Sequence, residues 1–158
     1  MTETAIELRG VLLPLKAHQL LLPNLSMLEV IGYRQAEAVN DSPDWLIGMI
    51  NWNQRRIPLI GFDYFLTNAL PEPGYRARIA LCYNPEANSQ IPLLAILCDA
   101  VPHLARLNNE TLKDLDDNAI TQMMLKKARY MDEIVWVPDL AGVAQMASIY
   151  LTEADLAY

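Results

Sequence analysis

Short apolar runs separated by polar breaks recur along the chain, and the clearest case lies in residues 48–62. There an apolar run at 49–52 enters a polar tip at 53–56 and leaves as a second apolar run at 57–60. Two apolar runs around a short polar tip are typical of a β-hairpin. Pro58 cannot donate a hydrogen bond to a neighbouring strand, so we expect it at an edge or a bulge of the sheet.

The same pattern predicts strands on both sides of this hairpin. Residues 6–22 predict a first hairpin, with His18 as a solvated side chain at its turn. A linker at 67–74, rich in proline and glycine, precedes a second set of strands. That set comprises the apolar runs 77–83, 91–101, 103–107, 125–131 and 134–137, with a polar loop and a short helix expected at 108–118.

Three segments carry helical signals. Ser26 and Glu29 have the spacing of a capping box, and residues 42–48 begin with Ser-Pro and end on glycine, so each segment predicts one or two helical turns. After Asp139, apolar residues recur at helical spacing up to residue 151. The pattern predicts a C-terminal amphipathic helix with Asp139 as its N-cap.

Composition narrows the class of protein. The chain has 158 residues, of which 53% are hydrophobic, and a formal net charge of −7. This indicates a compact globule and disfavours nucleic acid as a partner, since nucleic acid is itself polyanionic. The longest apolar stretch, 91–102, contains two prolines and Asp99 and is too short to cross a bilayer. No signal peptide is visible, so we expect a cytoplasmic protein without direct membrane insertion.

The sequence offers no recognisable catalytic or metal-binding motif. Cys82 and Cys98 lack CxxC spacing and the two histidines are far apart, so we expect reduced core thiols and no metal site. The acidic run 114–117 lacks the remaining ligand spacing of a calcium loop. No nucleotide-binding, hydrolase or metalloprotease motif is present, which predicts neither a cofactor nor enzymatic activity.

Several apolar residues fall on the expected turns and hairpins, where they either plug the end of a small barrel or line a groove for a partner helix. They are Met27, Val30, Trp45, Ile47, Met49 and Trp52.

Residues 27–33 and 42–60 together resemble the signature of the CheW family of bacterial chemotaxis coupling proteins. In that family a V-x-E-I turn precedes the block T-P-x-F-I-x-G-V-x-N-L-R-G-x-x-x-P-(V/I)-(I/V)-D-L, and this chain matches its spacing without a gap. Residues 95–101 resemble the family's G-I-V-V-D-x-V, and 134–137 resemble its final apolar strand. The resemblance covers nearly the whole chain.

The resemblance implies a mainly β fold of two intertwined SH3-like five-stranded β-barrels, with short helical turns and a C-terminal helix. The chain would be a single CheW-like domain over 1–158. Its first barrel would span 5–66, completed by 140–158, and its second 76–138. Such a protein is a non-enzymatic adaptor that couples the cytoplasmic tip of methyl-accepting chemoreceptors to the regulatory domain of a CheA-type histidine kinase. It would be cytoplasmic and recruited to membrane-associated receptor arrays.

Carried over by position, the receptor groove would draw on Met27, Val30, Gly48 and Ala95, with Glu29 as the signature glutamate. Gly48 and Ala95 are included because small residues would leave room for a helix.

The chain departs from the family at the hairpin tip, Trp52-Asn53-Gln54, where the family has L-R-G. Asn53 replaces the arginine that would pair with Glu29, and Arg55 or Arg56 could substitute from the same tip. The aspartate of the D-L motif is Gly61, and the last strand ends in Pro138. These departures resemble an accessory coupling protein of the ChpC kind, found in chemosensory systems that control type IV pili and twitching motility.

Two other functions stay open from the sequence. One is a stand-alone β-barrel that binds a small ligand or an unrelated peptide, and the other is a kinase-like catalytic role, which lacks any nucleotide-binding motif. An adaptor should have an exposed apolar groove open enough for a helix, whereas a ligand binder should have an enclosed cavity.

Overall fold

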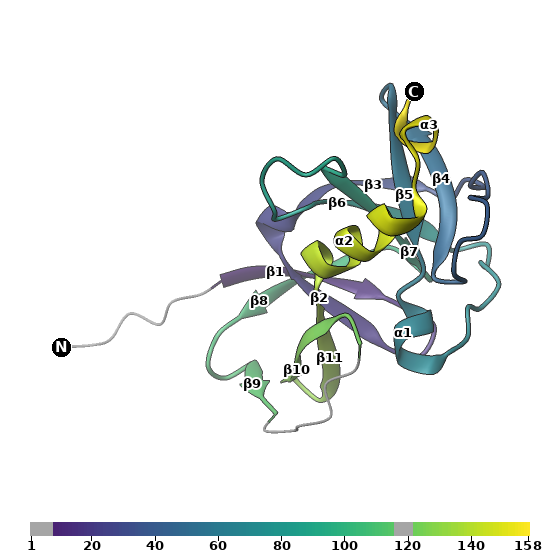
Figure 1. Cartoon of the computed structure of the whole chain (residues 1–158). Helices are drawn as coiled ribbons and strands as arrows, with labels where there is room; N and C mark the ends of the chain where they lie inside the picture. Colours follow the sequence, from purple (N-terminus) through teal and green to yellow (C-terminus); the bar gives the residue numbers. More distant parts are fainter. Residues whose placement is uncertain (1–7, 116–121) are drawn as a thin grey trace.

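The computed structural model describes residues 8–115 and 122–158, which form two β-sheets and a C-terminal helical segment (Figure 1). The larger sheet has the strand order β8-β1-β2-β11-β10-β9, and the smaller has the order β3-β6-β7-β5-β4. The larger comprises β1 (Leu8–Pro14), β2 (Gln19–Pro23), β8 (His103–Leu107), β9 (Leu112–Asp114), β10 (Met124–Tyr130) and β11 (Glu133–Pro138). The smaller comprises β3 (Met27–Gly32), β4 (Leu46–Trp52), β5 (Arg55–Ile60), β6 (Arg78–Tyr83) and β7 (Leu93–Cys98). The expected mainly β fold with two sheets is confirmed, although one sheet has six strands rather than five.

The predicted central hairpin is confirmed as β4–β5. Its strands are antiparallel, and the two residues at the tip, Asn53 and Gln54, have φ values of 48° and 60°. Two successive positive φ values are typical of a type I′ turn, whose twist matches that of the flanking strands. Pro58 faces β4 on one side, and the pairing of β5 with β7 begins only at Leu59. The proline therefore lies on an interior strand of the sheet, at a position where β4 alone is paired with that strand.

Each sheet takes strands from both halves of the chain. The hairpin β1–β2 pairs with β8 and β11, while β6 and β7 pair with β3 and β5. The division into 5–66 and 76–138 that the sequence suggested is therefore not the division between the sheets. The reason is that hydrogen bonds between distant strands, rather than order along the chain, decide which strands share a sheet.

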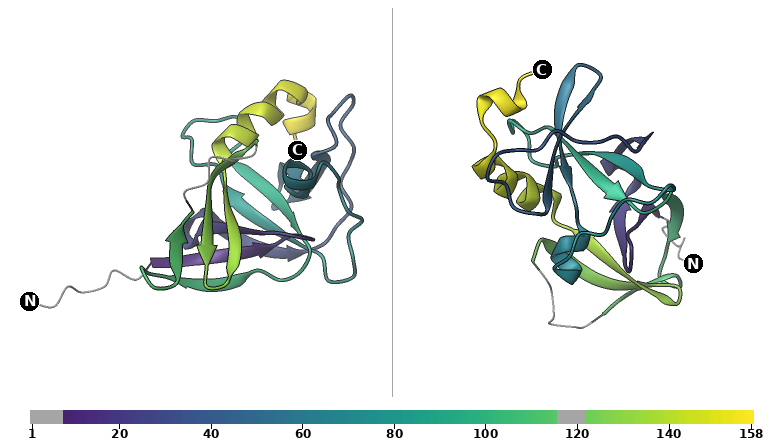
Figure 2. Two further views of the ribbon diagram at one scale, coloured as in Figure 1. Left: turned by 90° about the horizontal axis from the view of Figure 1, so that it is seen from below. Right: turned by 90° about the vertical axis from the view of Figure 1, so that its right-hand side faces the viewer.

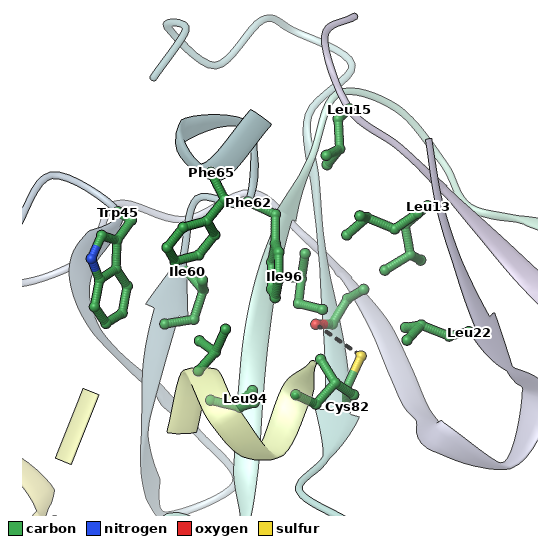
Figure 3. Close-up of a cluster of buried hydrophobic side chains, with 14 of the residues drawn as sticks. Leu13, Leu15, Leu22, Trp45, Ile60, Phe62, Phe65, Cys82, Leu94 and Ile96 are labelled. Atoms are coloured by element: carbon green, nitrogen blue, oxygen red, sulfur yellow. Dashed lines mark hydrogen bonds between the residues drawn. The ribbon is translucent and has the colours of Figure 1, made fainter. Parts of the chain in front are cut away.

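The described residues form three hydrophobic clusters, one inside each sheet and one between the sheets. The strand β7 shows the arrangement, because every one of its residues is buried. Leu93, Ala95 and Leu97 belong to the cluster inside the smaller sheet, and Leu94, Ile96 and Cys98 to the cluster between the sheets. In Figure 3, Leu13 and Leu22 of the larger sheet contribute to the same core as Leu94 and Ile96 of the smaller. Alternate side chains of one strand thus serve two cores.

Two predicted helical turns are wrong. Residues Met27–Gly32 form β3, which pairs with β6 from Met27–Cys82 to Gly32–Arg78, and the expected capping box of Ser26 is absent. A 3-10 turn, η1 (Asn24–Ser26), precedes this strand. Residues 42–48 form a turn that passes into β4 at Leu46. In both segments, pairing with a neighbouring strand outweighed a local capping signal.

The C-terminal helix is confirmed as α2 (Leu140–Tyr150), with the Asp139 side chain accepting a hydrogen bond of 2.9 Å from the Gly142 N–H. Its buried face packs on the core between the sheets. The chain then continues along the β4–β5 hairpin, where α3 (Glu153–Leu156) lies beside β5 (Figure 2). The sequence reasoning predicted neither α3 nor α1 (Asp63–Thr67). In the polar stretch 108–118 it predicted a helix where β9 forms, and residues 116–118 lie outside the described ranges.

Candidate interaction surfaces

Gly48 lies beside the point where the smaller sheet closes into a barrel. The segment that follows β3 returns to β4, where Glu37 and Met49 exchange main-chain hydrogen bonds of 2.9 and 2.8 Å. A Cβ atom on Gly48 would lie 2.8 Å from the carbonyl carbon of Glu37 and closer still to its oxygen. The space that glycine leaves at this position is therefore filled by the chain's own backbone and offers no room for a partner helix.

Ala95 does not reach the surface either. Its exposed fraction is 0%, and its neighbours in the sheet are Leu59 on β5 and Leu81 on β6. Of the residues carried over to a receptor groove, only Met27, Glu29 and Val30 lie together, on β3. Val30 is 39% exposed and Glu29 is exposed, whereas Met27 is half-buried with its Sδ 3.6 Å from the Cys82 Sγ.

The apolar residues on the expected turns divide between core and surface. Trp45 and Met49 are 4% and 1% exposed, so they belong to the core. Ile47 and Trp52 are half-buried and pack against the cluster inside the smaller sheet. Met27 is half-buried too and packs against the cluster between the sheets, so the core interpretation holds for five of the six, all except Val30.

The hairpin tip is held to the rest of the barrel by Arg56. Its guanidinium donates to the Glu37 carboxylate at 3.0 Å, to the Asn51 side-chain oxygen at 3.3 Å and to the Asp155 carbonyl at 2.8 Å. Arg56 thus pairs with Glu37 rather than with the signature glutamate Glu29. At the very tip, Asn53 and Arg55 are exposed.

An apolar groove opens where four strands of the larger sheet end and the η1 turn leads into β3. Its volume is about 440 Å³, and Leu8 and Leu25 at its border are 61% and 90% exposed. The lining residues are Leu8, Arg9, Leu21, Leu22, Pro23, Asn24, Leu25, Leu107 and Val137. Sequence reasoning missed this groove because its walls come from strand ends far apart in the chain. The available signal was Leu25, an apolar residue between Asn24 and Ser26, just before a predicted helical turn.

Gly10 lies beneath the groove, on β1. A Cβ atom there would lie 2.9 Å from a Leu107 methyl carbon and 3.1 Å from one of Leu21. The absence of a side chain at residue 10 thus allows two of the lining leucines to take their positions. Glycine inside a strand often marks such a close approach.

A separate hollow of about 650 Å³ brings the two histidines of the chain to one place. Its lining includes Lys16, His18, His103, Asp132 and Glu133. His18, expected to be solvated, is half-buried with its ring 6.4 Å from that of Trp136. Within the described residues, no three His, Cys, Asp or Glu side chains lie close enough together to hold a metal ion.

Asp63 is a buried carboxylate at the junction of the two sheets. It is 5% exposed, and its Oδ1 accepts a hydrogen bond of 3.1 Å from the Lys16 main-chain N–H in the β1–β2 turn. Burial raises the pKa of Asp63, and the charge of Asp99 raises it further, against the lowering effect of that hydrogen bond.

A family model described as the CheW-like domain matches residues 9–148. The chain belongs to the CheW-like domain family. Among solved structures, this CheW-like chain is similar to the scaffolding protein TtCheW from Thermoanaerobacter tengcongensis, with a TM-score of 0.69 and 14% sequence identity. The alignment covers 87% of this chain and 88% of TtCheW, and at that identity it shows a shared fold. No protein of curated function matches the CheW-like chain by sequence.

Membrane-spanning helices are not found in the described part of the CheW-like domain. Its longest helix there, α2, has 11 residues, whereas about 20 are needed to cross a bilayer.

Proposed function

We propose that this protein is a non-enzymatic adaptor of bacterial chemosensory signalling, which couples methyl-accepting chemoreceptors to a CheA-type histidine kinase in the cytoplasm. Membership of the CheW-like family supports this kind of function. The observation that carries the proposal is the exposed apolar groove beside η1. An open apolar groove distinguishes an adaptor for helices from a binder of enclosed ligands.

The groove suits the apolar face of a receptor helix. Eight of its nine lining residues are uncharged, and seven of these eight are leucine, proline or valine. A docked helix would bury Leu8 and Leu25, which are otherwise left in contact with water. Because η1 leads directly into β3, Met27 and Val30 would lie next to the docked helix. The proposed receptor site thus keeps the β3 residues of the family signature and replaces Gly48 and Ala95 with the groove leucines.

The hairpin tip is the second proposed contact, with the kinase regulatory domain. Trp52, Asn53, Arg55 and Arg56 form the end of a hairpin that extends beyond the barrel (Figure 1). Asn53 stands where the family signature has arginine. This departure favours an accessory coupling protein, such as those of chemosensory systems for twitching motility and type IV pili.

The test is a substitution that removes the groove's apolar border without touching the core. Leu25→Asp changes a side chain that is 90% exposed, and Leu104→Asp is the matched control, since Leu104 is 78% exposed and does not line the groove. Affinities would be measured for the cytoplasmic signalling fragment of a receptor encoded in the same genome and for the kinase regulatory domain.

We expect Leu25→Asp to weaken receptor binding by at least about tenfold, because docking would have to remove a carboxylate from water at the apolar border of the groove. Binding of the kinase domain to this variant, and of both partners to Leu104→Asp, should stay within about twofold of wild type. Equal receptor binding by both variants would place the receptor site elsewhere. Absence of any binding by the wild-type protein would reject the adaptor function for these partners.

A small apolar ligand is the second candidate occupant of the groove. The volume of about 440 Å³ falls within the range of ligand sites, roughly 300–1,000 Å³. If the wild-type protein fails to bind both signalling partners yet binds an apolar dye, and Leu25→Asp abolishes dye binding, this alternative is supported.

A further inference from the structure

The C-terminal segment, residues 152–158, lies against the hairpin that carries the proposed kinase contact (Figure 1). Its helix α3 contacts β5, and the Arg56 Nε donates a hydrogen bond of 2.8 Å to the Asp155 carbonyl. That carbonyl belongs to the last turn of α3, where helical carbonyls have no partner within the helix. The hairpin therefore supplies a donor that α3 itself lacks.

This contact occupies one of the residues proposed to bind the kinase domain. Asn53 and Arg55 are exposed at the hairpin tip, whereas the Arg56 side chain is only 14% exposed. A kinase domain that docks on the tip can reach the first two residues directly. It can take over the Nε donor of Arg56 only when the C-terminal segment has moved away.

The attachment of α3 to the hairpin is slight. The helix has four residues, none of them buried, and a helix of this length is not stable by itself in water. Leu156 is half-buried and packs against the core between the sheets. The capping box between Thr152 and Asp155 stabilises the helical turn rather than its contact with β5. The Arg56 hydrogen bond and the packing of Leu156 thus hold the segment in place.

The segment can move without disturbing α2. Leu151 and Thr152, which connect the two helices, both have extended backbone conformations. The buried residues of α2 all lie between Leu140 and Ala147. Changes of backbone angle at the two connecting residues are therefore enough to lift α3 from β5.

The space beside the hairpin is only partly filled by the segment. A hollow of about 500 Å³ lies there, with walls formed by residues 54–57 of the hairpin, by residues 90, 92 and 93, and by Leu156 and Tyr158. Tyr158 is 75% exposed. A partner can enter this hollow and meet the hairpin and the C-terminal segment together.

We propose that the C-terminal segment is a displaceable cover of the kinase contact, which leaves β5 when the kinase regulatory domain binds. The cover and the kinase domain compete for one guanidinium. In the free protein the Asp155 carbonyl accepts from the Arg56 Nε, and in the complex an acceptor of the kinase domain replaces it. The apparent affinity is reduced in proportion to the fraction of molecules that are uncovered. This inference rests on the proposed function and adds a regulation of the hairpin contact.

The experiment weakens the cover in the full chain and leaves the hairpin unchanged. Leu156→Ser removes the packed side chain, and Thr152→Ala removes the capping box. Ala154→Ser is the matched control, because Ala154 is exposed in the same helical turn. None of the three changes the charge. Affinities for the purified kinase regulatory domain and receptor signalling fragment would be measured, with limited proteolysis after Leu151 to report on release and thermal unfolding to verify the fold.

We expect Leu156→Ser and Thr152→Ala to be cleaved faster than wild type and to bind the kinase domain at least about threefold more tightly, since a larger fraction is uncovered. Receptor binding should stay within about twofold of wild type in both. Ala154→Ser should match wild type in all three measurements.

Faster cleavage with unchanged or weaker kinase binding would overturn the inference and leave the proposed function standing. Cleavage at the wild-type rate in both variants would also overturn it, because the segment would then be a fixed part of the fold. If the receptor fragment binds but neither wild type nor any variant binds the kinase domain, the kinase contact and its cover are both rejected. If neither partner binds any of the proteins, the adaptor function itself is rejected for these partners.

Discussion

At the scale of single residues, the surroundings in the fold decide what a small or charged side chain does. Gly48 and Gly32 are both glycines of the smaller sheet, yet a Cβ atom at Gly48 would collide with the backbone of Glu37, and one at Gly32 would meet nothing within 4 Å. Asp63 is a carboxylate in a part of the core where Lys16 donates to it from the main chain. Each position leads to a measurable effect on stability.

Gly48→Ala should lower the free energy of unfolding by about 1–3 kcal/mol, because the added methyl group forces Glu37 away from Met49 and opens the barrel closure. Gly32→Ala is the matched control and should change the stability little. Urea denaturation of both variants measures the difference. Equal stability of the two variants would show that the Glu37 backbone moves aside without loss of free energy of unfolding.

Asp63→Asn should make the protein more stable than wild type at neutral pH. The raised pKa of Asp63 means that the folded state keeps a proton above the ordinary value of 3.8, where the unfolded state has lost it. The wild-type free energy of unfolding should therefore fall as the pH rises through the interval between these two pKa values, and level off above it. Asparagine cannot ionise and retains an oxygen for the Lys16 N–H, so this fall should be absent.

Denaturation curves recorded from acidic to neutral pH provide the measurement for Asp63. The two proteins should be about equally stable below pH 3.8, where both side chains are neutral. A variant less stable than wild type at neutral pH would mean that the ionised carboxylate is stabilising.

At the scale of elements, the segment that follows α2 lies on the surface of the fold. The helix α3 has no buried residue. Two polar interactions hold it, the reciprocal capping box between Thr152 and Asp155 and the hydrogen bond from Arg56 to the Asp155 carbonyl. The Leu156 side chain also packs against the core between the sheets. Arg56 also binds Glu37, which lies between β3 and β4. One side chain of β5 therefore joins that segment to the C-terminal segment.

Arg56→Ala should loosen the attachment of α3 to the hairpin, because it removes the hydrogen bond to the Asp155 carbonyl and α3 has no buried residue. Arg55→Ala is the control, as Arg55 is exposed at the neighbouring position. Limited proteolysis should cleave the segment after Leu151 several times faster in Arg56→Ala than in wild type, and at the wild-type rate in Arg55→Ala. Similar rates for the two variants would show that the capping box and the packing of Leu156 secure the segment without Arg56.

At the scale of the whole molecule, the two sheets are joined by one shared core. Cys82 on β6 and Cys98 on β7 belong to this core, and each is 0% exposed. Burial raises the pKa of Cys82 to about 12 and also raises that of Cys98, so both thiols stay protonated and unreactive. They therefore report on separation of the sheets.

Single-cysteine variants, Cys82→Ala and Cys98→Ala, should react with a thiol reagent at equal rates, set by global unfolding. This is expected because the sheets share their largest cluster, so opening it exposes both thiols. The measurement is the labelling rate in increasing urea, compared with unfolding followed by tryptophan fluorescence. If either thiol is labelled faster than the protein unfolds in the absence of urea, the sheets separate without global unfolding.

The sequence by itself determined the features that depend on short segments. The hairpin β4–β5, the strands β1, β2, β6, β7, β10 and β11, and the Asp139-capped helix α2 follow from side-chain periodicity, turn residues and capping, which act over a few residues. The family followed from motifs in 27–33 and 42–60, because their spacing is contained in the sequence.

Tertiary structure alone decided which strands share a sheet, and with that the surfaces. Pairing with β6 made a strand of Met27–Gly32 despite its helical capping signal. Closure of the barrel enclosed Gly48 and Ala95, which the signature had suggested as groove residues. The groove itself arises where the ends of β1, β2, β8 and β11 meet. Its lining residues extend from Leu8 to Val137 in the chain. Long-range pairing depends on the combined burial of all apolar faces, so no single segment contains the information that places these surfaces.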